Sequence, residues 1–378
     1  MPYLDRSYHP RGRASVRARA AIAMAAVLVA SLCGAGGVAQ AQSAPNDLST
    51  PTANLTGAGS TFDQPFFTLA FYDYYKLNPD VTVAYASIGS GGGIAQFQAN
   101  TVNFGASDVP MAASDLAKDT GGAALQIPVA LGGEAISYNL PGIKSGLHLT
   151  GSLLANIYLG KVKNWDNIAI KKLNPGVDLP NRGITVVHRS DGSGTTYIFT
   201  NYLAVVSKPW ASGPGVGKSP DWPVGVGGKG NEGVAGEVAD IKGSIGYVEL
   251  DYALESKFTF AAMQNAAGKF VLPSIRTVAA DAAENPNVTP TNFPIVNEPG
   301  AASYPISGYS WALVYVKQTN TNVAIALARV LDWLTHAGQA DAQSLDYVPL
   351  PANIQALAQT DIAQILTPAG TEAWTASF

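Results

Sequence analysis

Residues 184–195 read ITVVHRSDGSGT, and this stretch decides the fold class. Its first five residues are rich in β-branched side chains and predict a buried strand. The Gly- and Ser-rich turn that follows leads into a helical pattern through Tyr197, Phe199 and Leu203. A strand that passes through a short turn into a helix is the repeating unit of a parallel sheet. The sequence therefore predicts an α/β fold.

The same strand, turn and helix theme occurs twice earlier in the chain. Leu55-Thr56 leads through the turn 57–61 into an apolar helical pattern at 62–77, and 81–85 leads through 89–93 into 94–98. Further expected elements are strands at 103–108, 127–131, 135–138, 245–249 and 311–316 and helices at 152–159 and 323–335. The stretch 265–300 is rich in Ala, Asn and Pro and has weak periodicity, so we expect an irregular surface excursion there.

The N-terminus has the pattern of an export signal. Five arginines lie between residues 6 and 19, an apolar run covers 20–38, and Ala39-Gln40-Ala41 offers small residues for a signal peptidase. This pattern predicts a signal peptide over residues 1–41, cleaved after Ala41, and a periplasmic location. An uncleaved membrane anchor remains the alternative, because the apolar run is long.

Composition excludes several classes of protein. Hydrophobic residues make up 47% of the 378 residues and charged residues 13%, which favours folded cores over disorder. The single cysteine, Cys33, lies in the signal segment, so the mature chain forms no disulfide. Removing residues 1–41 leaves a formal charge of −8 and no basic patch, so we expect no nucleic-acid partner.

The three turns share features that bind anions. Each one starts a helix, whose first turn has N–H groups without internal partners and carries a partial positive charge. Glycines let the backbone approach a ligand closely. Hydroxyl groups add donors, namely those of Thr61, Ser90, Ser193 and Thr195.

Two charged residues give these turns a more specific chemistry. The planar guanidinium of Arg189 suits two oxygens of a tetrahedral anion, and Asp191 is placed to brace it. Asp108 ends a short strand and adds a carboxylate. A carboxylate repels a fully ionised anion but accepts a hydrogen bond from one that keeps a proton, as phosphate does at neutral pH and sulfate does not.

Other readings of the same turns are weaker. Gly57-Ala58-Gly59 begins like a dinucleotide fingerprint, but Phe62 stands where the last glycine belongs, and no turn ends as a P-loop does. Ser193 lacks the glycine two residues before it that a hydrolase elbow requires. No histidine has partners at metal-ligand spacing, so we expect neither metal nor cofactor. Each turn taken alone could be purely structural.

Taken together, the chain resembles the periplasmic phosphate-binding proteins of phosphate-specific ABC transporters. The motifs that carry the resemblance follow one another in that family's order over about residues 55–350: GAGSTF (57–62), IGSGGG (88–93), NTVNFGASD (100–108), IYLGK (157–161), RSDGSGT (189–195), GGKGN (227–231), GSIGYVE (243–249) and LDY (345–347). Ser60 replaces a commoner Ala and Gly91 a commoner Ser.

The resemblance implies a two-lobed periplasmic-binding-protein fold of type II, with a hinge of crossing strands and phosphate between the lobes. Lobe 1 would combine residues 42–134 with 304–378, and lobe 2 would be residues 135–303. The implied phosphate contacts are Thr61, Phe62, Ser90, Asp108, Arg189, Ser193, Gly194 and Thr195, with Asp191 behind Arg189.

The implied function is high-affinity phosphate binding and delivery to the membrane permease of an ABC importer, by a monomer and without catalysis. Two alternatives stay open. One is a binding protein for another tetrahedral oxyanion, or an adhesive or structural relative of the fold, and the other is a phosphatase-like enzyme that uses Asp108 or Ser193.

Overall fold

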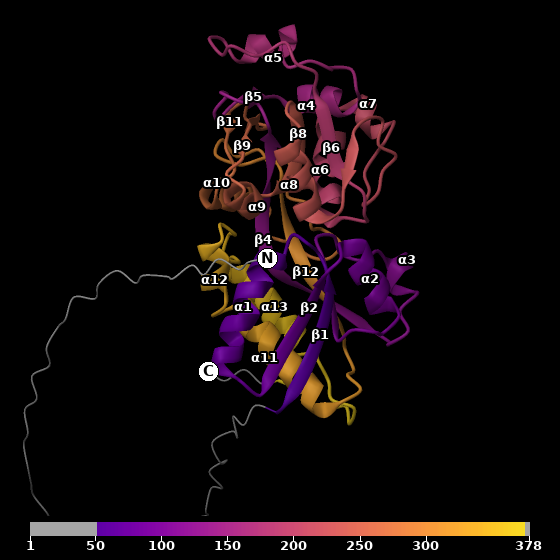
Figure 1. Ribbon diagram of the computed structural model, residues 1–378. Coiled ribbons are helices and arrows are strands. Elements are labelled where there is room, and N and C mark those ends of the chain that lie inside the picture. The colour runs from indigo at the N-terminus through magenta and orange to yellow at the C-terminus, as the bar shows by residue number, and fades with distance from the viewer. Residues whose placement is uncertain (1–50, 375–378) are drawn as a thin grey trace, which may run out of the picture. The chain divides into compact units, whose positions relative to one another are not determined.

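The computed structural model describes residues 51–374. Strands and helices alternate along most of this range, and the strands form a large sheet and a small one (Figure 1). The predicted α/β class is therefore confirmed. The predicted signal peptide and its cleavage after Ala41 lie outside the described residues. Across residues 51–374, none of the helices has the length and apolarity needed to cross a membrane.

The large sheet contains both parallel and antiparallel pairs. Its strands are β1 (Ala53–Gly59), β2 (Val81–Ser87), β3 (Phe104–Ser107), β4 (Ala124–Tyr138), β6 (Thr185–Arg189), β7 (Val226–Gly228), β8 (Ser244–Glu249), β9 (Thr259–Phe260) and β12 (Ser307–Tyr315). They follow the order β2-β1-β3-β12-β4-β8-β6-β7, and β9 pairs with β4. Strands β1, β2 and β3 run parallel, as do β6, β7 and β8. A small sheet adds β5 (His148–Leu149), β10 (Ala262–Gln264) and β11 (Phe270–Val271).

Strands β4 and β12 join the two parallel groups. Strand β4 pairs with β12 over Ala124–Gly133 and with β8 over Glu134–Tyr138, so one continuous strand serves both groups. All nine residues of β12 are buried, and its register against β4 shifts between Ser310 and Trp311. A bulge of this kind re-aims neighbouring side chains. It lies beside the candidate site described below.

Helices cover the sheet and enclose two main cores. They are α1 (Gln64–Leu77), α2 (Ser90–Gln98), α3 (Ala113–Leu116), α4 (Gly151–Tyr158), α5 (Ile168–Leu173), α6 (Gly194–Val206), α7 (Lys208–Ala211), α8 (Gly230–Asp240), α9 (Leu250–Glu255), α10 (Ile275–Glu284), α11 (Thr321–Thr335), α12 (Gln339–Ser344) and α13 (Ala352–Ile362). One core gathers Phe66, Phe67 and Leu327 under α1 and α11. The other gathers Trp165, Tyr202 and Tyr247 under α4 and α6. In Figure 1, β4 passes from one of these regions into the other.

The expected break between strands 127–131 and 135–138 is wrong. Gly132 and Gly133 fall between the two expected strands, but both stay within β4. A Cβ at Gly132 would lie 2.6 Å from the Phe62 ring, and one at Gly133 would lie 2.6 Å from Val278. These glycines therefore serve close packing across the strand and not a turn.

The expectation of an irregular surface excursion over 265–300 is also wrong in part. This stretch contains β11 and helix α10, whose first turn is capped by Ser274 accepting from Thr277 N. Val278 and Ala282 on α10 are 1% and 3% exposed. Alanine and polar residues make the apolar pattern of this helix faint, although Ile275, Val278, Ala279 and Ala282 all pack against the core.

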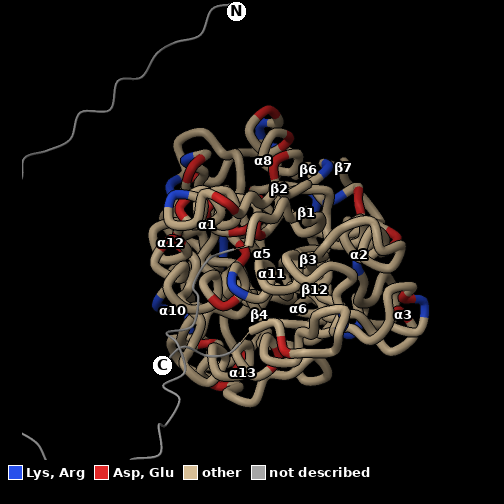
Figure 2. The backbone as a smooth tube through the Cα atoms, turned by 90° about the horizontal axis from the view of Figure 1, so that it is seen from below, with Lys and Arg blue, Asp and Glu red and all other residues tan. Residues whose placement is uncertain are grey.

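Charged residues are sparse and mixed in sign. Figure 2 shows basic and acidic positions interspersed along the tube, and neither sign gathers into a continuous patch in that view. An anion would therefore be held by local geometry and not by the field of the whole molecule.

Candidate functional site

Four of the predicted phosphate contacts follow the parallel strands β1, β2 and β3. Thr61 and Phe62 follow β1, Ser90 follows β2 and starts α2, and Asp108 follows β3. Parallel strands end at the same edge of a sheet, and β1 pairs with both β2 and β3. This topology brings the three turns together, and each side chain is at most 2% exposed.

The other predicted contacts follow β6. Arg189 is the last residue of that strand and is 3% exposed. Ser193 caps α6, because its Oγ accepts from Thr196 N at 3.0 Å. Gly194 and Thr195 are the first residues of that helix. The turn thus presents a guanidinium, backbone N–H groups and hydroxyls at one helix start.

Hydrogen bonds connect these two groups of turns. Ser90 Oγ accepts from Gly194 N at 3.0 Å and from Asp108 N at 3.3 Å. Thr195 Oγ1 donates to Asp108 Oδ2 at 3.2 Å. Gly194 must lack a side chain, because a Cβ there would lie 2.5 Å from the Asp108 Cβ. Residues about 100 positions apart in the sequence therefore form one buried cluster.

Asp108 is the centre of this cluster. Its Oδ1 accepts from Ser60 Oγ and from Ser310 Oγ, the latter at 3.0 Å. Burial raises the pKa of Asp108, while the hydroxyls of Ser60, Ser310 and Thr195 and the charge of Arg189 oppose the rise. Several donors thus stabilise a buried carboxylate that could accept one further hydrogen bond.

Arg189 is held by Asp191 through two parallel hydrogen bonds. Nε donates to Oδ1 at 2.8 Å and Nη2 donates to Oδ2 at 2.6 Å. Burial alone would raise the pKa of Asp191, but the hydrogen bonds and charge of Arg189 outweigh it and lower that pKa. Arg189 Nη1 points to Thr195 Oγ1 at 3.4 Å. The pair fixes the guanidinium beside the Asp108 cluster.

Thr61 and Phe62 make contacts of a different kind. Thr61 Oγ1 accepts from Asn231 N at 3.1 Å and from Asn231 Nδ2 at 2.9 Å, while Tyr252 donates to the Thr61 carbonyl at 2.7 Å. The Phe62 amide donates to Ser60 Oγ at 3.0 Å, and its ring is buried. Direct contact of Phe62 with a ligand stays a prediction.

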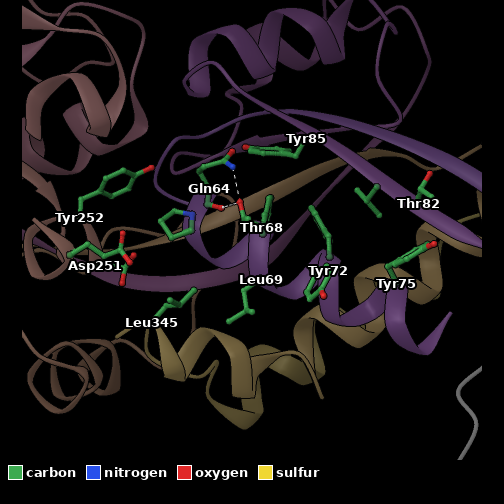
Figure 3. Close-up of a pocket in the computed structure, with 15 residues that line it drawn as sticks. Gln64, Thr68, Leu69, Tyr72, Tyr75, Thr82, Tyr85, Asp251, Tyr252 and Leu345 are labelled. Atoms are coloured by element: carbon green, nitrogen blue, oxygen red, sulfur yellow. Dashed lines mark hydrogen bonds between the residues drawn. The ribbon is translucent and has the colours of Figure 1, made fainter. Parts of the chain in front are cut away.

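A separate groove of about 970 Å³ lies outside this cluster. It is lined by α1, β2 and α9, and Figure 3 shows Tyr72 and Tyr75 along α1 with Asp251 and Tyr252 farther along the groove. Tyr72 is 59% exposed and Tyr75 45%. An open, aromatic groove without a basic lining residue does not suit a small anion.

Comparison with known proteins identifies the family. The PBP superfamily domain matches residues 39–337. The chain is 45% identical over 313 residues to the phosphate-binding protein PstS of Xylella fastidiosa, which covers 82% of this chain and 85% of that one. It is 44% identical over 310 residues to PstS of Pasteurella multocida, covering 81% and 89%. The chain belongs to the PstS family of phosphate-binding proteins.

A solved structure supports the fold of this PstS family member. The phosphate-binding protein of Stenotrophomonas maltophilia superposes with a TM-score of 0.62 at 20% identity, over 82% of this chain and 93% of that one. The predicted family and the predicted periplasmic-binding-protein fold are therefore confirmed. PstS proteins are binding proteins, which agrees with the prediction that the chain is not an enzyme.

Sequence reasoning missed several polar residues of this PstS site. Asn231 stands in the quoted motif 227–231 but was given no role, although it contacts Thr61 and lies 3.4 Å from Thr195 Oγ1. Ser60 appeared only as a departure from the family pattern. No sequence pattern singled out Asp63, which comes just after the motif 57–62, or Ser310, which lies within the apolar strand β12. Among residues 51–374, no group of three His, Cys, Asp or Glu side chains could hold a metal ion.

Proposed function

We propose that this protein captures inorganic phosphate in the periplasm and delivers it to the permease of an ABC importer. The observation that carries the proposal is the buried cluster of Asp108, Arg189 and hydroxyls at the ends of parallel strands. Membership of the PstS family supports the same ligand.

Each predicted contact has a distinct task in this proposal. Arg189 supplies charge and two donors in a fixed plane, held by Asp191. Ser90 and Ser193 supply hydroxyl donors. The Gly194 N–H and the Thr195 hydroxyl would turn from their partners in the cluster, Ser90 Oγ and Asp108 Oδ2, to the anion. Asp108 accepts a hydrogen bond from the proton that phosphate keeps at neutral pH. Sulfate has no such proton, so it would face an ionised carboxylate without a hydrogen bond.

The energy needed for tight binding is within reach of this set. Micromolar affinity corresponds to about 8 kcal/mol. Hydrogen bonds to charged groups contribute roughly 1.5–3 kcal/mol each. Several of them together exceed that requirement and leave room for the entropy lost on association.

We also propose that the cluster opens and closes by movement of two lobes about β4 and β12. Lobe 1 would comprise residues 42–134 with 304–378, and lobe 2 residues 135–303. Support comes from β4, which changes partner from β12 to β8 at Gly133 and Glu134. Closure would bring the full set of hydrogen-bond donors around the anion. It would also present one closed surface to the permease.

The location and assembly belong to the same proposal. Residues 1–41 would direct export and be cleaved after Ala41. The mature chain would act as a monomer in the periplasm. Mass spectrometry of the secreted form, with Gln42 as the first residue, tests the cleavage site directly.

Isothermal titration of the phosphate-stripped mature protein tests the binding function. We expect one-to-one phosphate binding and no measurable heat with sulfate at neutral pH. Binding of both anions would keep the cluster as an oxyanion site but remove the proton-reading role of Asp108. Binding of neither would contradict the proposal.

A further inference from the structure

A second buried carboxylate lies next to Asp108 and takes no part in the contacts proposed above. Asp63 is 0% exposed and stands at the start of α1, yet its side chain does not cap that helix. Its Oδ2 instead lies 2.7 Å from Ser310 Oγ, and its Oδ1 has no hydrogen-bond partner. Such a group requires an explanation, because buried polar atoms are normally paired.

Ser310 stands between the two carboxyl groups. Its Oγ lies 2.7 Å from Asp63 Oδ2 and 3.0 Å from Asp108 Oδ1. A hydroxyl has a single hydrogen, so it can donate to only one of these oxygens. If both carboxyl groups were ionised, the other short contact would join two lone pairs in a buried space. One of the two acids must therefore carry a proton.

The surroundings decide which acid carries it. Asp108 accepts from the hydroxyls of Ser60 and Thr195 and lies near the guanidinium of Arg189, whereas Asp63 has Ser310 alone. The charge of Asp108 is thus stabilised and that of Asp63 is not. Burial and then the charge of Asp108 raise the pKa of Asp63 well above its usual range. Tyr85 and Tyr347 also face this region, and burial keeps both phenols neutral by raising their pKa values. Glu134 on β4 interacts with Asp108 as well, and burial, followed by the charge of Asp108, raises the pKa of Glu134 well above its usual range.

We infer that Asp63 is a protonated positioning residue, which donates to Ser310 so that Ser310 donates to Asp108 and keeps it an ionised acceptor. The order of donors is Asp63 Oδ2–H to Ser310 Oγ, then Ser310 Oγ–H to Asp108 Oδ1. This relay acts on Oδ1, so Asp108 Oδ2, which already accepts from Thr195 Oγ1, keeps its second lone pair to accept from the proton of the ligand. The inference rests on the proposed phosphate function for its consequence but not for its protonation state.

The protonation state can be measured without any ligand. Infrared spectroscopy separates the carbonyl stretch of a protonated acid from that of a carboxylate. We expect the difference between wild type and Asp63→Asn at neutral pH to show the loss of one protonated-acid band. A difference that shows the loss of a carboxylate band would overturn the inference, and it would do so whether or not the protein binds phosphate.

The consequence for selectivity needs a second variant. Ser310→Ala removes a donor from Asp108, so Asp108 takes up a proton at a higher pH and can then donate to sulfate. We expect the phosphate/sulfate affinity ratio of this variant to fall about tenfold at pH 5 and less at pH 8, since one unit of pKa is a tenfold change. Asp63→Asn keeps a donor toward Ser310 and should retain the ratio at both pH values.

Ser244→Ala is the matched control, because this buried hydroxyl donates only to the Val238 carbonyl. It should leave the ratio unchanged at both pH values. A Ser310→Ala ratio equal to that of wild type across the pH range would overturn the relay. Wild-type protein that fails to bind phosphate would contradict the proposed function, while the infrared result would still decide the state of Asp63.

Discussion

The proposed discrimination between phosphate and sulfate depends on the carboxylate of Asp108. Asp108→Asn replaces a charged, acceptor-only carboxylate by a neutral amide that can also donate, so sulfate gains a donor and the proton of phosphate loses its charged acceptor. We expect the phosphate/sulfate affinity ratio to fall by at least about tenfold. Competition titrations with both anions measure it. The exposed Asp221→Asn serves as control, and an unchanged ratio in Asp108→Asn would contradict this role.

In the proposed site, phosphate affinity depends on how Asp191 holds Arg189. Arg189→Lys keeps the positive charge but loses both parallel hydrogen bonds to Asp191. We expect phosphate affinity to fall about 10- to 100-fold, the equivalent of one or two charge-assisted hydrogen bonds. Calorimetric titration measures the loss. The exposed Arg182→Lys should bind as wild type does; a similar loss there would point to a general effect of net charge.

At this scale the sequence indicated the chemistry but not the full cluster. The predicted contacts followed strands or opened helices, where glycine and hydroxyl patterns are visible in the sequence. Ser310 lies in a fully buried strand, and only the register shift next to it aims its hydroxyl at Asp108. Register between distant strands has no local signature, so neither Ser310 nor its contact with Asp63 could be inferred.

Among the elements, helix α10 carries a buried acid that should make stability depend on pH. Burial raises the pKa of Asp281 to about 9, while an aspartate in the unfolded chain titrates near 4. The folded state therefore keeps this proton longer, and its stabilising contribution is complete below about pH 4 and is lost as pH rises toward 9.

Asp281→Asn removes this titration. We expect thermal unfolding of the variant to vary less between pH 5 and pH 8 than that of wild type, with the variant gaining stability at the higher pH. Over that range this group should lower the free energy of unfolding of wild type by up to about 1.4 kcal/mol per pH unit. The exposed Asp240→Asn is the control, and equal pH slopes for all three proteins would contradict the assignment.

The elements that sequence patterns predicted well were those with clear periodicity, such as α1, α11 and β6. The errors at 132–133 and 275–284 have physical causes. Glycine marks a turn or a close approach alike, and only the positions of Phe62 and Val278 decide between them. Helix α10 packs through small side chains, so its apolar pattern is faint although Val278 and Ala282 are buried.

For the whole molecule, β4 and β12 should make the two cores unfold together. Both strands pass between the parallel groups, so one core cannot lose its strands without exposing those of the other. The ligand cluster adds cross-links such as Ser90 to Gly194 and Thr195 to Asp108. A bound anion would strengthen contacts to both sides at once.

This coupling predicts a single thermal unfolding transition, and bound phosphate should raise its midpoint temperature. At a phosphate concentration about 1,000 times Kd, binding adds about 4 kcal/mol to the free energy of unfolding. For a chain of this size that corresponds to a rise in Tm of roughly 6 °C. Differential scanning calorimetry with and without phosphate measures it, with sulfate as the control anion. Two transitions, of which phosphate moves only one, would mean that β4 and β12 do not couple the cores and that the anion contacts one side alone.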